Sequence, residues 1–243
     1  MIECHTPLFV VNLPRRHDRR QWMELQLQRA GFKATVEFTS DWPIETDGLR
    51  LSHATLASSG YQLFDWEQRQ SGNMWWNRPL KWGEVGCSIA HIHCWHAIAN
   101  SPAPFGIIVE DDVVIAPNAH SRFRRALHGL KQDQVAWDLI YLGRFPIGPD
   151  TRVTEHLVIP GYSHCTFGYV VTRDAAARML GTEPLRAIIP ADEFLPAMYV
   201  EHPRADVRKR FPPMLRAVAF DPPLITQLPK DDAGSDTEAT AFV

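Results

Sequence analysis

The sequence predicts an α/β fold in which helices flank a Rossmann-like, mostly parallel sheet of the nucleotide-binding type. The segment 105–115 (FGIIVEDDVVI) contains a continuous apolar run, which is typical of a strand buried on both faces. The chain also opens with strand, helix and strand in succession, the usual start of such a domain. With 243 residues it is long enough for one large domain with a substantial core.

The first elements follow from apolar spacing and from residues that start or stop helices. Residues 8–13 (LFVVNL) predict a buried strand, and residues 34–39 predict a second one. Between them, Asp18 can cap a helix that Gly31 ends. The apolar positions of this helix recur at helical spacing and are Trp22, Met23, Leu25, Leu27 and Ala30.

Residues 40–82 show no clear periodicity and contain several prolines and glycines. Four tryptophans fall in this segment, namely Trp66, Trp75, Trp76 and Trp82. A long loop without secondary structure is uncommon inside a compact domain. The segment is therefore either functional or holds elements that its pattern does not reveal.

Helices and strands alternate again in the rest of the chain. A helix is predicted over residues 84–99, and another begins at Asn118 with Phe123, Leu127 and Leu130 facing inward. Residues 137–142, 167–171 and 222–228 predict strands, and a short helix is predicted over residues 174–181. The tail from residue 229 is polar and acidic, and its composition predicts disorder.

Composition excludes several classes of protein. A formal net charge of −3 argues against a general nucleic-acid or anionic-membrane binder. No stretch reaches the roughly 20 apolar residues of a membrane span, and the apolar run 8–13 is too short for a secretory leader. The scattered cysteines Cys4, Cys87, Cys94 and Cys165 form no disulfide framework. These features predict a cytoplasmic protein.

Three consecutive acids, Glu110, Asp111 and Asp112, follow the central apolar strand. Open α/β sheets bind ligands at the carboxyl ends of their strands. Because side chains alternate along a strand, we expect Glu110 and Asp112 on one side and Asp111 on the other. Two such oxygen ligands can hold Mn²⁺ or Mg²⁺ against a diphosphate. The alternative is an acidic strand end that caps a helix or faces water.

Basic residues follow the first strand directly, and the set is Asn12, Arg15, Arg16, Arg19 and Arg20. Arginines at a strand-to-helix turn can bind phosphate oxygens, together with the helix N-terminus. Asn12 and Arg15 lie closest to the strand end. For Arg16 and Arg20 a solvated helix face is an equally good interpretation.

Two further groups each have two interpretations. Asp192 and Glu193 follow Pro190, so an acid there is either a helix N-cap or a general base at the ligand edge of the sheet. Cys87, His91 and Cys94 share one helical face at zinc-ligand spacing. No second Cys or His pair supports zinc, so the alternative is a thiol-lined buried face with one hydrogen-bonded histidine.

The chain resembles glycosyltransferase family 25, which includes bacterial lipooligosaccharide galactosyltransferases and procollagen galactosyltransferases. The resemblance runs nearly end to end, over VVNLPRRHDRR (10–20), RPLKWGEVGCSIAH (78–91), IIVEDDV (107–113), WDLIYLGR (137–144), GYVVT (168–172), DEFLP (192–196) and SDTE (235–238). The last three segments are closer to the collagen-modifying branch. The length and the missing signal and retention sequences are closer to the bacterial members.

This resemblance implies a GT-A domain over residues 1–228, followed by a polar C-terminal tail over 229–243. It also implies a UDP-sugar donor, a divalent metal and inversion at the anomeric carbon. The implied metal ligands are Asp112, Glu110 and Asp236, and the implied donor-binding residues are Asn12, Arg15, Arg19, Asp41, Glu84, Glu110 and Asp111. Cys87 and His91 become parts of the family's GC-x-x-x-H segment.

The sequence departs from the family pattern at two points. Members usually carry Asp-Gly after the second strand, whereas Asp41 is followed by Trp42. A histidine often completes the metal shell near the carboxyl terminus, but residues 222–228 contain none. Gln227, Asp236 or water is then expected in its place.

The expected reaction is one displacement in which an acceptor hydroxyl attacks the donor sugar, which is galactose, glucose or an N-acetylhexosamine. Asp192 is the expected base and Glu193 the second choice. Lipooligosaccharide or another glycan, a hydroxylated peptide or protein, and a small natural product are all candidate acceptors. Trp75, Trp76 and Trp82 either contact the acceptor, form a closing lid, or only pack the loop. A metal-dependent nucleotide hydrolase or nucleotidyltransferase and a degenerate sugar-binding module are the alternative functions.

Overall fold

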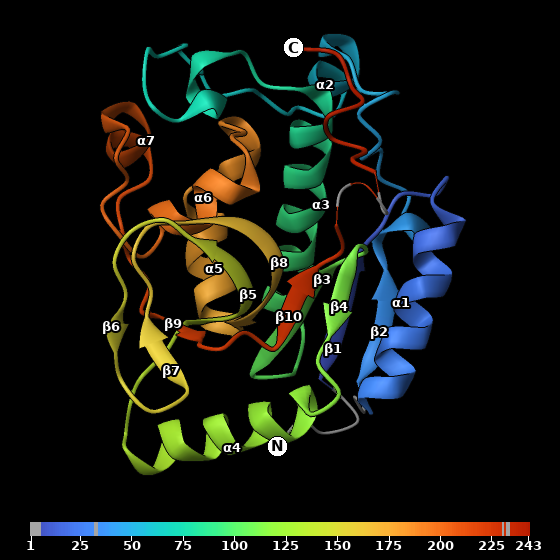
Figure 1. Cartoon of the computed structure of the whole chain (residues 1–243). Helices are drawn as coiled ribbons and strands as arrows, with labels where there is room; N and C mark the ends of the chain where they lie inside the picture. The colour runs from blue at the N-terminus through green and yellow to red at the C-terminus, as the bar shows by residue number, and fades with distance from the viewer. Residues whose placement is uncertain (1–5, 32–33, 230, 232–233) are drawn as a thin grey trace.

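The computed structural model describes residues 6–31, 34–229, 231 and 234–243, so Cys4 lies outside the described residues. Over these ranges the chain forms an eight-stranded sheet with helices on both faces (Figure 1). In spatial order the strands are β2 (Thr35–Phe38), β1 (Pro7–Val11), β3 (Phe105–Glu110), β8 (Ser163–Thr172), β5 (Leu139–Pro146), β9 (Ala217–Phe220), β7 (Leu157–Ile159) and β6 (Thr151–Arg152).

Most strands of this sheet run in one direction. Strand β1 is parallel to β2 and β3, and β5 is parallel to β9. Strand β8 is antiparallel to β3 and β5, and β7 is antiparallel to β9 and β6. Among the described strands of the sheet, only β8 and β7 therefore oppose the common direction. The predicted α/β class with a mostly parallel sheet is confirmed.

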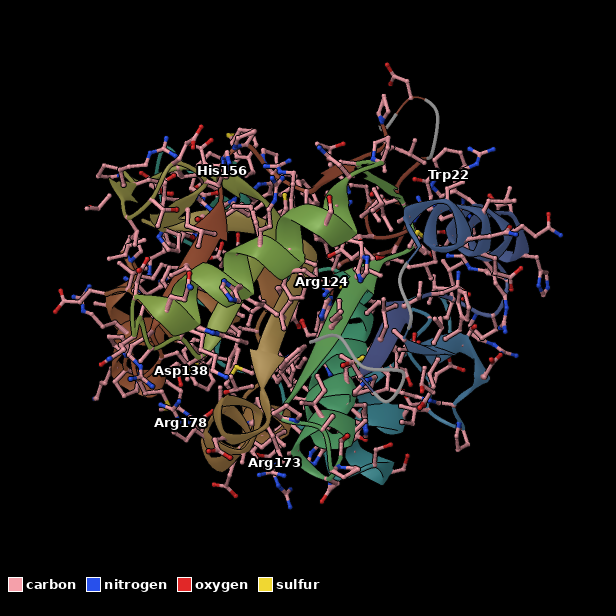
Figure 2. All side chains as sticks on the ribbon, turned by 90° about the horizontal axis from the view of Figure 1, so that it is seen from below. Trp22, Arg124, Asp138, His156, Arg173 and Arg178 are labelled. Carbon is pink, nitrogen blue, oxygen red and sulfur yellow. The ribbon has the colours of Figure 1, made fainter. Side chains whose placement is uncertain are left out.

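Each face of the sheet has its own helical layer. Helices α1 (His17–Ala30) and α4 (Ala119–Gln132) pack on one face through residues such as Met23 and Phe123. Helices α3 (Trp82–Ala99), α5 (Arg173–Gly181) and α6 (Ala191–Ala197) pack on the other, with α7 (Ala205–Arg210) at its edge. Seen from below, α4 crosses the strands with the exposed Arg124 on its surface (Figure 2).

The central strands are apolar because they separate two cores. Phe9 and Ile108 belong to the core under α3, α5 and α6, whereas Val10 and Ile107 belong to the core under α1 and α4. Burial of each such side chain stabilises the fold by about 1.5–3 kcal/mol. The continuous apolar runs of the sequence therefore correspond to strands buried on both faces.

The predicted elements from the first strand to Gly181 occur, with local differences. Strand β3 ends at Glu110, and residues 113–115 form the separate strand β4 (Val113–Ile115), which pairs with β10 (Ile225–Gln227). Helix α1 ends at Gly31 as predicted, with φ of 67° in the left-handed region. Its N-cap is Arg16 rather than Asp18, and Leu25 is 48% exposed.

Several short elements have no clear sequence signal. Residues 39–82, which include the Trp-rich segment (residues 40–82), contain the 3₁₀ helices η1 (Thr39–Asp41) and η2 (Met74–Asn77) and the α-helix α2 (His53–Ser58). A third 3₁₀ helix, η3 (Pro184–Arg186), precedes α6. Strands β6, β7 and β9 have 2, 3 and 4 residues, too few for a periodic pattern. None of the described helices is both long and apolar enough to cross a bilayer.

The C-terminal tail is the largest difference from expectation. Val243 N donates to Leu80 O at 2.8 Å, and Lys81 Nζ contacts Glu238 Oε2 at 2.6 Å. These contacts hold the tail against the start of α3, so the predicted disorder is wrong for residues 234–243. Composition could not reveal this, because the partners lie about 157 residues away in the chain. The domain boundary at residue 228 stays a prediction.

Candidate functional site

A pocket opens at the carboxyl ends of β1 and β3, beside the first turns of α3 and α6. It contains about 1490 Å³ of non-protein space, open mouth included. Its lining comes from segments far apart in the chain and includes Asn12, Arg19, Asp47, Cys87, Glu110, Asp111, Asp112, His164, Asp192, Glu193, Gln227 and Asp236.

The three consecutive acids line the pocket, but strand alternation does not describe them. Asp111 accepts hydrogen bonds from Arg19 Nη1 and Asn12 Nδ2, both at 2.8 Å. Asp112 lies 3.6 Å from the same Arg19 nitrogen and accepts a bond from Gln227 Nε2 at 3.2 Å. The expectation that Asp111 faces away from Asp112 is therefore wrong, because β3 ends at Glu110 and both aspartates lie in the turn after it.

Asp112 has the properties of a cation ligand. Its Oδ1 is buried and has no hydrogen-bond partner among the described residues. Burial, followed by the nearby Glu110 charge, raises the pKa of Asp112 to about 6. A buried oxygen without a partner carries a desolvation cost that a bound cation would remove. Since Glu110 and Gln227 add further oxygen atoms nearby, the donor set fits a hard divalent cation such as Mn²⁺ or Mg²⁺.

Asp236 joins the C-terminal tail to the basic turn after β1. It contacts Arg15 at 2.6 Å, Arg19 at 3.5 Å and also Arg16. Arg15 contacts Asp47 as well, at 2.7 Å. Both oxygens of the suggested third metal ligand are therefore engaged by arginines. Of the three arginines, Arg19 lines the pocket next to Asp111 and Asp112, whereas Arg15 and Arg16 are not among the lining residues.

Two residues implied for donor binding lie elsewhere or have local partners. Asp41 forms an ion pair with Arg20 at 2.6 Å on the exposed surface and does not line the pocket. Glu84 does line it, but its carboxylate accepts from Lys81 N at 2.7 Å and Arg78 Nη2 at 2.8 Å. The Glu84 side chain is therefore used in the cap at the start of α3, together with Lys81.

An Asp-Gly dipeptide lies further along the chain, at Asp47-Gly48, and it lines the pocket. Its distance from the second strand gave no sequence signal for a place in the site. The loop packs tightly against α3: a Cβ on Gly86 would lie 1.9 Å from Thr46 O, and one on Gly48 would lie 2.4 Å from Gly83 N. Glycine is needed at both positions so that the loop can approach the helix.

Asp192 faces the pocket and does not cap its helix. The N-cap of α6 is Pro190, and Asp192 Oδ1 accepts from Thr166 Oγ1 at 3.1 Å. Thr166 also bonds to Glu110. The Thr166 hydroxyl has one hydrogen and can donate it to only one of the two carboxyl groups. When both contacts form, the other carboxyl group is protonated and donates to Thr166 Oγ1. Burial and then the Glu110 charge raise the pKa of Asp192 to about 7, the range suited to proton transfer at neutral pH.

Glu193 has a different environment from its neighbour Asp192. Its carboxylate accepts from Trp76 Nε1 at 2.9 Å and Tyr162 OH at 2.6 Å, and His202 Nε2 lies at 2.7 Å. Burial opposes ionisation, but the hydrogen bonds of His164 and His202 outweigh it and lower the pKa of Glu193 below its ordinary value. This residue anchors the Trp-rich segment and is poorly placed to accept a proton from a ligand.

The four tryptophans of the aromatic segment have separate roles. Trp66 and Trp75 line the pocket, and the buried indole nitrogen of Trp66 has no hydrogen-bond partner among the described residues. Trp76 binds Glu193, and Trp82 is buried in a small core with Leu80 and Ile89. Packing and pocket lining therefore both occur in this segment.

Strand β8 supplies residues that sequence reasoning missed. His164 and Cys165 line the pocket, and Thr166 bridges Glu110 and Asp192. The signal available was the polar run SHCT (163–166) directly before the apolar FGYVV (167–171). The start of β8 lies at the ligand edge because β8 is antiparallel to β3 and β5, so its amino end meets their carboxyl ends.

Comparison with known proteins gives one family. The model described as "Glycosyltransferase family 25 (LPS biosynthesis protein)" matches residues 5–144. "Procollagen galactosyltransferase 1-A" of Xenopus laevis is 32% identical over 247 residues, which cover 97% of this chain and 38% of that protein. "Inactive glycosyltransferase 25 family member 3" of Homo sapiens is 31% identical over 244 residues, 96% of this chain and 39% of that protein. The chain thus spans about two fifths of these curated relatives.

Proposed function

Because the chain belongs to glycosyltransferase family 25, we propose that it transfers a sugar, galactose by analogy with its procollagen galactosyltransferase relatives, from a UDP-sugar to an acceptor hydroxyl. The observation that carries this proposal is the content of one pocket. A buried aspartate oxygen without a partner among the described residues, the guanidinium of Arg19 and a carboxyl group with a pKa of about 7 meet there. These are the groups that a metal-dependent displacement of UDP requires.

The donor's diphosphate would bind beside Arg19 and Asn12, which line the pocket next to the acids. Arg15 does not line the pocket but contacts Asp236, which does. Asp112, with Glu110, would hold the divalent cation, which when bound neutralises charge that develops on the leaving diphosphate. Asp47 and Asp236 keep the arginines in position through the ion pairs described above.

Asp192 is the proposed base that removes the proton of the attacking hydroxyl. Its pKa of about 7 allows it to accept a proton at neutral pH, and Thr166 fixes the orientation of its carboxyl group. Direct attack with a single displacement inverts the configuration of the sugar. Glu193 is not the proposed base, because its oxygens already accept three hydrogen bonds.

The acceptor would lie on the aromatic side of the pocket. Trp66 and Trp75 can stack against a sugar or a peptide, and the Trp66 indole nitrogen can donate to an acceptor oxygen. The relatives named procollagen galactosyltransferases support a hydroxylated peptide as one acceptor class. The lipopolysaccharide description of the family model supports a glycan as the other.

A second candidate function is nucleotide-sugar binding without transfer. It is favoured by the relatives named inactive, which are as similar to this chain as the galactosyltransferases are. In such a protein the donor pocket persists although no acceptor is glycosylated.

The first experiment is thermal unfolding with a panel of nucleotide sugars, with Mn²⁺ or with a chelator. A ligand that binds the folded state raises Tm by mass action. A Tm increase that needs both one UDP-sugar and Mn²⁺ supports the donor site, and UDP release on adding acceptor then separates transfer from binding. Release of UDP without any acceptor product would indicate a hydrolase. No increase with any UDP compound would refute the proposed donor.

A further inference from the structure

A thiol and a carboxylate that line the pocket meet a buried imidazole beside it. They belong to Cys87 and His91 on α3 and to Glu110 at the end of β3. One ligand atom from each of the three lies within 4.8 Å of the others, and His91 Nε2 lies 3.8 Å from Glu110 Oε1. Cys87 also lines the pocket, so a small ion can reach the group from solvent.

This group differs from the zinc set that helical spacing suggests. Cys87 and His91 are four residues apart and share one face of α3. Cys94, one turn further, is fully buried in the apolar core with Trp95 and Ile98. The third ligand is therefore Glu110 at the end of β3, which residue spacing along α3 cannot predict.

The imidazole of His91 is held as metal-binding histidines usually are. Its Nδ1 lies 2.8 Å from Tyr169 OH, which also accepts a hydrogen bond from Trp95 Nε1 at 2.8 Å. These contacts leave Nε2 on the side of Glu110 and Thr166. A hydrogen bond at the second ring nitrogen fixes the ring of a metal ligand. Burial lowers the pKa of His91 to about 4, so the ring is neutral at neutral pH.

The charges around Cys87 favour a cation. Burial, and then the carboxyl groups of Glu110, Asp192, Asp112 and Asp111, raise the pKa of the Cys87 thiol well above its ordinary value. The same negative field that opposes a bare thiolate attracts a divalent metal to this position.

We propose that Cys87, His91 and Glu110 form a site for a thiophilic divalent cation of the Zn²⁺ class, with a fourth position open to the pocket. Thiolate, imidazole and carboxylate are the ligands that Zn²⁺ takes, whereas Mn²⁺ and Mg²⁺ prefer oxygen alone. Binding breaks the S–H bond of Cys87 and forms a metal–sulfur bond, and the proton passes to solvent. The site does not depend on the proposed function, because none of its three ligands is assigned from the reaction.

Titration of the metal-free protein with Co²⁺ tests the site directly. A thiolate bound to Co²⁺ gives a charge-transfer absorption band in the near ultraviolet, and Zn²⁺ added afterwards should remove the band by displacement. We expect Cys87→Ser to abolish the band. Cys165→Ser is the matched control, since Cys165 also lines the pocket, and this variant should keep the band.

A second variant, Glu110→Gln, keeps the proposal testable if Cys87→Ser does not fold. Glu110→Gln keeps the thiol and should keep the band but weaken Co²⁺ affinity by about tenfold or more. Circular dichroism establishes that each variant is folded. Absence of the band in the wild-type protein, its loss in Cys165→Ser, or its survival in folded Cys87→Ser would each overturn the proposal. None of these results depends on UDP-sugar binding, so failure of the metal site and failure of the donor site are distinguishable.

Discussion

Asp192→Asn should make the protein more stable at alkaline pH and, under the proposed function, inactive. The folded protein holds the Asp192 proton up to a pKa of about 7, whereas the ordinary value for aspartate is 3.8. Between these values the folded state binds more protons than the unfolded chain does. Stability is therefore lost as pH rises from about 4 to about 7, and the loss is complete above that range. Asparagine cannot ionise, so the variant escapes this loss.

The size of the gain follows from the same two values. A difference of about three pH units at 1.36 kcal/mol each gives about 4 kcal/mol as an upper bound. Because Glu110 shares the proton through Thr166, removal of one carboxyl group relieves only part of this amount, and we expect about 2 kcal/mol. For a chain of 243 residues that corresponds to an increase in Tm of about 4–8 °C. The asparagine oxygen can still accept from Thr166, so the packing is retained.

The assay is Tm of the wild type and the variant at pH 5 and pH 8, in chelator. Asp41→Asn is the matched control, because Arg20 lowers the pKa of that exposed aspartate and its neutralisation brings no gain at pH 8. Sugar transfer should fall by about 10²–10⁴-fold in Asp192→Asn. An Asp192→Asn variant that is no more stable at pH 8, or whose gain is the same at pH 5, would refute the assignment of a buried, proton-holding carboxyl.

Three further changes test other parts of the site. Asp112→Asn removes the charge of the carboxyl group that carries the buried oxygen, and Mn²⁺-dependent UDP binding, measured by calorimetry, should weaken about tenfold or more. Unchanged affinity would contradict the role of Asp112 as a cation ligand. Glu193→Gln removes the charge of a buried, hydrogen-bonded carboxylate and should lower the free energy of unfolding, measured in urea, by about 3–5 kcal/mol. A decrease below about 1 kcal/mol would show that the partners of Glu193 do not depend on its charge. Gly86→Ala should lower the free energy of unfolding by about 1–3 kcal/mol, because the added Cβ forces the loop away from α3. Gly129→Ala is the control and should stabilise α4, because nothing lies within 4 Å of its added Cβ. Equal changes in stability for the two variants would contradict the close approach of the loop to α3.

The fold could be predicted because its signals are local. Apolar runs such as 8–11 and 107–109 are continuous along the chain, and Gly31 directly follows the last residue of its helix. The short strands β6 and β9 were not predicted, because a strand of 2 or 4 residues has too few side chains to show a period. They form because they pair with longer strands, which is a tertiary effect.

From apolar patterning, the site could be predicted where its residues stand next to a strand end. Asn12 directly follows β1, Glu110 ends β3, and Arg19 lies in the first turn of α1, so their place in the pocket follows from the topology of a parallel sheet. Thr166 and Asp236 could not be found this way. Thr166 meets Asp192 across 26 residues, and Asp236 meets Arg16 across 220, so neither pair leaves a pattern along the sequence.

The electrostatic state of the site follows from how these distant residues meet. Arg19 contacts Asp111, Asp112 and Asp236, which come from the turn after β3 and from the tail. Even so, burial keeps the pKa of Asp112 and Asp192 well above the ordinary value for aspartate. The fold therefore bears a stability cost at this edge of the sheet, and the two large cores offset it. A carboxyl group held in that state can release its proton on binding a cation, or accept the proton of a substrate hydroxyl once it is ionised, as the proposed function requires.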